Sequence, residues 1–107
     1  MILTTTETVP GRQITEVVGI VSGEAVMGTN FFRDFLAGIR DIFGGRSGGY
    51  QRAMHDAKQA VLQEMAEEAK ELGADAVIGI TLLPYAIASD KDKMLAVSAS
   101  GTAVKVR

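Results

Sequence analysis

Three arginines and a run of glycines between residues 33 and 49 carry the clearest chemical signal in this chain. Arg33 and Arg40 lie two turns apart at helical spacing, and Arg46 lies inside the run GGRSGG at residues 44–49. The guanidinium group suits carboxylate and phosphate, and successive amides of a glycine-rich turn can hold an anion at the start of a helix. The pattern predicts a small-ligand site made of Arg33, Arg40, Gly45, Arg46, Ser47 and Gly48.

The same residues also have a purely structural interpretation. The glycine run lacks the lysine of a P-loop and does not match the dinucleotide fingerprint, so a hinge between two helices would equally explain it. Neither Arg33 nor Arg40 has a carboxylate three or four residues away, the separation at which helical side chains pair. Their partners are therefore expected on another element or another subunit.

Metal and catalytic patterns are absent from the sequence. The only histidine, His55, has no carboxylate at the spacing of a helical metal pair, so Glu24 and His55 are candidate metal ligands only across a subunit boundary, and the cofactor is unknown. The chain has no cysteine, and Ser47 has no histidine base nearby. We expect a protein without enzymatic activity.

Length and charge set further bounds. A chain of 107 residues forms one domain, residues 1–107, and leaves much of its surface uncovered unless it associates. The net charge of -2 comes from 11 basic and 13 acidic residues spread along the chain, which predicts no nucleic-acid partner. No segment resembles a signal peptide or a membrane span, so a soluble cytoplasmic protein is expected.

An aromatic helix is predicted over Asn30–Phe43. Its apolar face holds Phe31, Phe32, Phe35, Leu36, Ile39, Ile42 and Phe43. An isolated helix of this length is marginal in water, so this face must pack on something. We expect a subunit interface formed by Phe31, Phe32, Arg33, Asp34, Phe35, Arg40 and Asp41.

The remaining elements should position these residues. The pattern predicts an edge strand in Ile2–Thr6, a strand over Gln13–Val26, and a long helix over Tyr50–Leu72 that Gly73 ends. Two further strands are expected over Ala76–Leu83 and Met94–Val106.

In the last of these strands the apolar residues change from odd-numbered to even-numbered positions. Leu95 and Val97 have odd numbers, whereas Val104 and Val106 have even numbers. Because side chains alternate between the two faces of a strand, this change predicts a bulge near Gly101. The segment Pro84–Lys93 is expected to connect the last two strands.

Several stretches resemble the YbjQ-like family, small bacterial proteins of unknown function to which heavy-metal binding is ascribed. They are VSGE at Val21–Glu24, GTNFF at Gly28–Phe32, RDFLAGIRDIFGGRSG at Arg33–Gly48, LGADAVIG at Leu72–Gly79 and VSASGTAV at Val97–Val104. The resemblance implies an α+β subunit: a curved antiparallel sheet packed on one long helix, plus a shorter amphipathic helix. It further implies a dodecin-like subunit assembled into a homopentameric ring.

One stretch departs from the family. Members typically carry acidic residues and a tyrosine after the glycine of the third strand, but here Gly79–Ala86 reads GITLLPYA and retains only Tyr85. The missing carboxylates weaken the expectation of metal binding. The leading hypothesis is a homo-oligomer that binds a small anion or metal ion at subunit junctions, and the alternative is a scaffold whose charged helix and glycine loop only build the ring.

Overall fold

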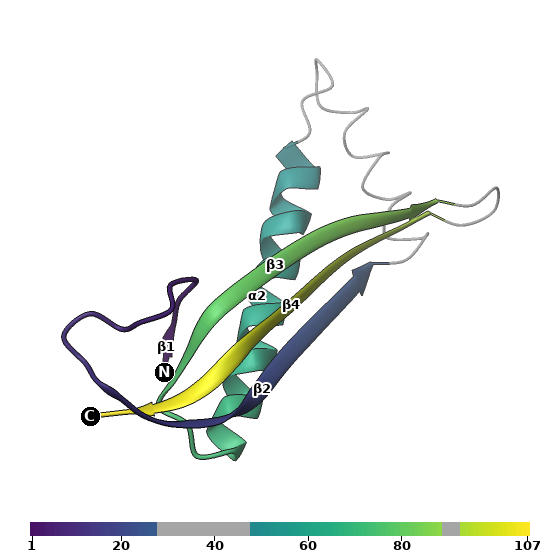
Figure 1. Ribbon diagram of the computed structural model, residues 1–107. Coiled ribbons are helices and arrows are strands. Elements are labelled where there is room, and N and C mark those ends of the chain that lie inside the picture. The colour runs from purple at the N-terminus through teal and green to yellow at the C-terminus, as the bar shows by residue number, and fades with distance from the viewer. Residues whose placement is uncertain (28–47, 89–92) are drawn as a thin grey trace.

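The computed structural model describes residues 1–27, 48–88 and 93–107 as an α+β fold (Figure 1). One long helix packs on one face of a four-stranded sheet with the order β1-β3-β4-β2. The elements are β1 (Ile2–Leu3), β2 (Ile14–Met27), α2 (Gly48–Glu71), β3 (Ala76–Ala88) and β4 (Lys93–Val106). β4 pairs antiparallel with both β2 and β3, and β1 pairs parallel with β3. This arrangement confirms the predicted α+β class and the predicted edge strand.

The aromatic helix predicted over Asn30–Phe43 lies outside the described residues, as do 89–92. The described helix, α2, has no stretch that is both long and apolar enough to cross a membrane.

α2 buries a stripe of small and medium apolar side chains against the sheet. The buried residues of this stripe are Ala53, Ala57, Val61, Met65 and Ala69. Their spacing of four residues keeps them on one helical face, as the sequence predicts. Gly73, at φ +79°, ends the helix as expected. Its N–H donates to the carbonyl of Lys70, and the N–H of Ala74 donates to that of Ala69, which is the Schellman arrangement.

Two glycines allow the close packing beneath α2. A Cβ at Gly23 of β2 would lie 2.8 Å from the carbonyl oxygen of Val61, so the helix backbone rests directly on this strand. A Cβ at Gly101 of β4 would lie 2.7 Å from Cγ1 of Val77.

The predicted bulge in the last strand is wrong. β4 pairs without interruption with β2 from Met27↔Leu95 to Ile20↔Thr102, and the register shifts opposite β4 lie in its two neighbours. In β3 the shift lies between Ile78 and Thr81, and in β2 the shifts lie between Ile14 and Glu16 and between Val17 and Gly19. The change from odd-numbered to even-numbered apolar residues in β4 has another cause. Val104 and Val106 belong to a second apolar cluster, on the face away from α2, where Val9 of the amino-terminal loop packs against Val104.

β3 is longer than the sequence predicts. It continues through Pro84 to Ala88, so the expected connection over Pro84–Lys93 is wrong for most of its length. β1 pairs only with Ala76 and Val77, so the described part of the sheet has no strand beside the distal half of β3. Proline is tolerated on such an edge, because its missing N–H interrupts no ladder.

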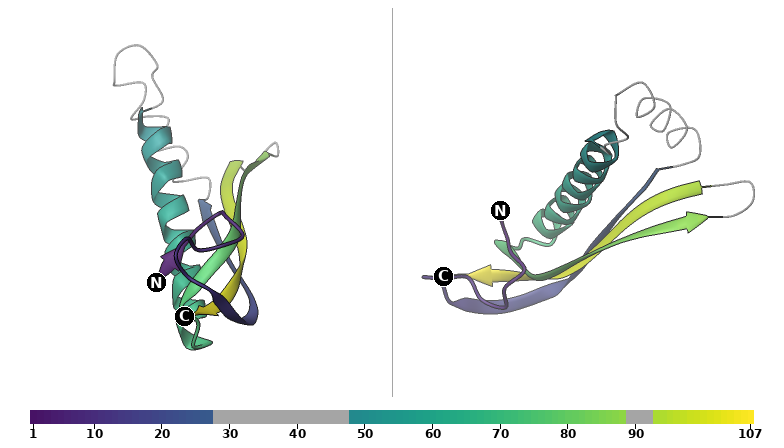
Figure 2. Two further views of the ribbon diagram at one scale, coloured as in Figure 1. Left: turned by 60° about the vertical axis from the view of Figure 1, so that its left-hand side comes forward. Right: turned by 90° about the horizontal axis from the view of Figure 1, so that it is seen from above.

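The two faces of the sheet are therefore unequal. Figure 2 shows α2 on one side of the long, bent strands, with both chain ends near one end of the sheet. The amino-terminal loop covers the other face only near this end, where Val9 packs against Ala76 and Val104.

Candidate functional site on the open face of the sheet

The sheet face away from α2, beyond the loop that carries Val9, is here called the open face. Residues opposite each other in an antiparallel pair project to the same side, and one cross-strand pair and three rows of three residues define this face. Its residues are Ile20 with Thr102; Ser22, Ser100 and Thr81; Glu24, Ser98 and Leu83; and Val26, Ala96 and Tyr85. The intervening positions Val21, Val97 and Ala99 belong to the core beneath α2.

Large apolar side chains are exposed on both outer strands of the open face. Ile20 is 79% exposed, Val26 51% and Leu83 58%. The central strand between them carries the small side chains of Ser98 and Ser100. Exposed apolar side chains that gather on one face are typical of an interaction surface, whereas single ones need no explanation.

Glu24 and Tyr85 form the polar centre of the open face. The Tyr85 hydroxyl donates to Oε2 of Glu24 at 3.4 Å, diagonally across β4. Desolvation raises the pKa of Tyr85 above its ordinary value of 10.0, and the charge and hydrogen bond of Glu24 raise it further. The phenol is therefore protonated at neutral pH. A carboxylate beside a neutral phenol can receive a cation, such as an ammonium or guanidinium group.

Glu24 lacks a cationic partner within the described part of the chain. The ion pair found there joins Lys105 Nζ to Glu16 Oε2 at 3.6 Å, between two exposed side chains. The open face thus combines exposed apolar side chains with a carboxylate that no described lysine, arginine or histidine neutralises.

The outer edge of β2 receives a contact that sequence reasoning missed. The backbone N–H of Ser22 donates to Oε2 of Glu68 at 3.1 Å. Glu68 belongs to an acidic stretch near the end of α2, with Glu64, Glu67 and Glu71, and such a stretch is most often a solvated face. The place of Glu68 beside Met65 and Ala69 of the buried stripe was the available signal, because a flanking position reaches the sheet edge.

The predicted metal ligands are not brought together. Glu24 projects from the open face, whereas His55 is exposed on α2, which covers the opposite face. Among residues 1–27, 48–88 and 93–107, no cluster of three or more histidine, aspartate and glutamate side chains could hold a metal ion. Of the predicted anion-binding residues, only Gly48 is described, as the first residue of α2. The predicted interface residues 31–41 also lie outside the described residues.

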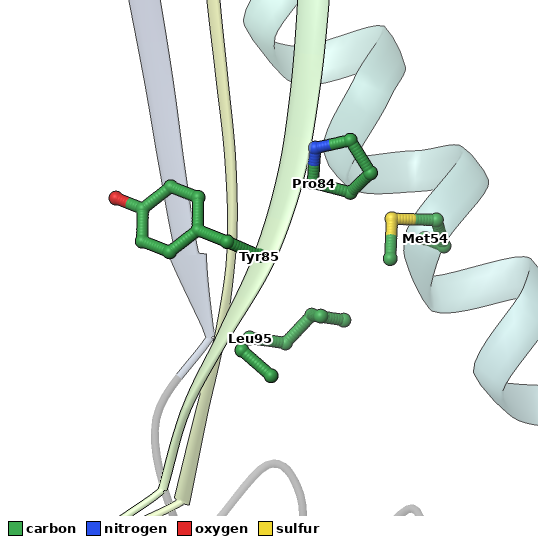
Figure 3. A pocket seen from close by; sticks show the side chains of 5 residues that line it. Met54, Pro84, Tyr85 and Leu95 are labelled. Carbon is green, nitrogen blue, oxygen red and sulfur yellow. The ribbon is translucent and has the colours of Figure 1, made fainter.

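A small pocket lies between the start of α2 and the distal strands (Figure 3). Met54, Pro84, Tyr85, Ala86 and Leu95 line its volume of about 230 Å³. Figure 3 shows the Tyr85 ring on the side of β3 away from Met54. The pocket therefore presents mainly apolar groups and no charge, and it suits a small apolar group rather than an ion.

Comparison with known proteins gives two matches. A family model described as "putative heavy-metal-binding" matches residues 1–107. A crystal structure of a protein of unknown function from Pediococcus pentosaceus, assigned to the DUF74 family, superposes with a TM-score of 0.70. It is 17% identical, and the match covers 100% of this chain and 98% of that one. At this identity the likeness shows a shared fold.

Proposed function

The chain belongs to the YbjQ-like family, and we propose that it is a self-assembling, non-enzymatic protein that binds a small ligand or ion where its subunits meet. The exposed apolar side chains of the open face carry this proposal, with Ile20 at 79% exposure as the extreme. Covering such a side chain contributes roughly 1 to 2 kcal/mol, since full burial contributes about 1.5 to 3. Association is the direct way to gain this free energy.

Ligand binding at the junction follows from where the polar groups lie. The described part of a single chain holds no metal cluster, and Glu24 and Tyr85 project from the face that assembly would cover. A site completed by a neighbouring subunit would explain why one chain looks incomplete. Arg33, Arg40 and the loop 45–48 are the sequence-based candidates for the remaining contacts.

A ring is the assembly that the family resemblance favours. We propose a cytoplasmic homopentamer of dodecin-like subunits, in which one surface of each copy meets a different surface of the next. A scaffold without any ligand is the alternative. A metal ion is a second candidate ligand because of the description of the family model, and its binding would depend on His55 or on Glu24 and other carboxylates of neighbouring subunits.

The native mass of the purified protein tests self-assembly. We expect a particle about five times the 11.3 kDa chain mass. Ile20→Glu should shift it toward the monomer, because a buried unpaired charge at the interface costs several kcal/mol. Gln59→Glu, on the exposed side of α2, is the control and should leave the mass unchanged. A monomeric wild type would overturn the proposal.

A further inference from the structure

Resting on the proposed self-assembly, we infer that the open face receives the aromatic segment 31–43 of a second copy, and that Arg33 and Arg40 of that copy supply the cation that Glu24 lacks. The open face requires a partner with two properties. It must cover Ile20, Val26 and Leu83, which are 79%, 51% and 58% exposed, and it must neutralise one carboxylate that has no described cationic neighbour.

The sequence of segment 31–43 has both properties. In a helix each residue is turned by about 100° from the one before it. The phenylalanines, the leucine and the isoleucines of the segment then share one side of the helix, and Leu36 lies at the edge of that side. Arg40 and Arg33 come next around the helix axis. A helix docked by its apolar arc would thus carry its arginines along the rim of the contact. Long arginine side chains reach a rim carboxylate while their stems cover apolar surface.

The segment of the same chain is a poor occupant. α2 lies on the opposite face of the sheet, and the sequence leaves only residues 44–47 between the predicted end of the aromatic helix and Gly48. Five Cα–Cα steps lead from Phe43 to Gly48, and they span at most about 18 Å. Helices of about 10 Å diameter on opposite faces of one sheet have axes roughly 20 Å apart, so a neighbouring copy fits better.

A second open face is also a poor occupant. Two open faces packed together would bring two Glu24 carboxylates into one apolar interface, and neither face has a described cation to pair with them. Burying like charges without partners costs several kcal/mol. The aromatic segment avoids this cost because it brings arginines.

Disulfide trapping tests the inference, because the chain has no native cysteine. Leu83→Cys and Phe35→Cys would be introduced into two differently tagged copies, which are co-expressed and then oxidised. Most of the Leu83→Cys chain should convert to a mixed covalent dimer. Gln63→Cys, on the exposed side of α2, replaces Leu83→Cys in the control pair and should give little product. Equal trapping by both pairs would overturn the inference.

A charge exchange gives a second, independent readout. Glu24→Lys alone, and Arg33→Glu with Arg40→Glu, should each reduce trapping, whereas all three changes together should restore it. Circular dichroism verifies that every variant is folded. The native mass separates the two proposals: a monomer contradicts self-assembly, whereas an intact oligomer without trapping contradicts only this contact. A covalent link within one doubly substituted chain would assign the open face to the chain's own segment.

Discussion

Tyr85 and Glu24 show how two exposed positions on different strands become one chemical unit. They are far apart in sequence and lie on the outer strands β3 and β2, but the small side chains of β4 let the phenol reach across to the carboxylate. Partial desolvation and the neighbouring negative charge favour the protonated phenol. At neutral pH this pair presents one negative charge and one neutral donor to an incoming group.

Spectrophotometric titration of the phenol tests this pair. The chain has two tyrosines, so the titration is best done in a Tyr50→Phe background. Tyr85 should ionise above its ordinary pKa of 10.0, and Glu24→Gln should lower its pKa, because the substitution removes the charge and weakens the hydrogen bond. Unchanged ionisation in Glu24→Gln would contradict the contact.

The same shift has a consequence for stability. The pKa of Tyr85 is raised by folding, so its contribution to stability is fully present below the ordinary value of 10.0 and is lost as pH rises through the folded pKa. Urea denaturation measures the difference in the free energy of unfolding between the wild type and Tyr85→Phe. This difference should therefore be smaller at alkaline pH than at neutral pH.

At the scale of elements, the contact between α2 and β2 sets the architecture. Gly23 lets the helix backbone at Val61 approach the strand, and Val21, Val61 and Met65 are fully buried around this contact. A backbone carbonyl cannot move aside as a side chain can. Any larger residue at this position must therefore lift the helix from the sheet.

Two glycine substitutions measure this contact. Gly23→Ala places a methyl 2.8 Å from the Val61 carbonyl oxygen and should lower the free energy of unfolding by about 1 to 3 kcal/mol. Gly19→Ala is the matched control on the same strand, because its nearest atom, Leu72 Cδ1, lies at an ordinary 3.7 Å. Urea denaturation gives both values. Equal losses in the two variants would show that glycine flexibility, and not the close approach, is responsible.

At the scale of the whole molecule, the two unequal faces are the central fact. α2 covers one face, and the loop that carries Val9 covers only the end of the other. The described elements include nothing else that lies over the rest of that face. Assembly and ligand binding therefore belong to the same surface in our proposal.

Bound mass in the native particle distinguishes a binding protein from a scaffold. If the junction holds a ligand or metal ion, the particle should carry extra mass that acid or a chelator removes. Arg46→Ala combined with Ser47→Ala should reduce that mass while the oligomer persists. Bare protein in the wild-type particle would favour the scaffold, and disassembly of the double variant would assign Arg46 and Ser47 to the interface.

The sequence alone determined the elements whose signals are local. A spacing of three or four residues predicted α2, and it is shown by Met54, Ala57, Val61, Met65, Ala69 and Leu72. Gly73 predicted the end of the helix, because periodicity and left-handed backbone depend on near neighbours in the chain. The long β-branched runs predicted β2 and β4 to within a residue or two. The family resemblance, which rests on contiguous motifs, was also confirmed by the family model.

Only the tertiary structure decided which strand residues meet on each face of the sheet. Val104 is apolar although it faces away from α2, because Val9 of a distant loop covers it. Pro84 can continue β3 because no described strand pairs with that side of β3 after the end of β1. The Tyr85–Glu24 pair likewise depends on the register of three strands. Such features arise from contacts between residues far apart in sequence, and a local pattern carries no information about which distant segment will lie alongside.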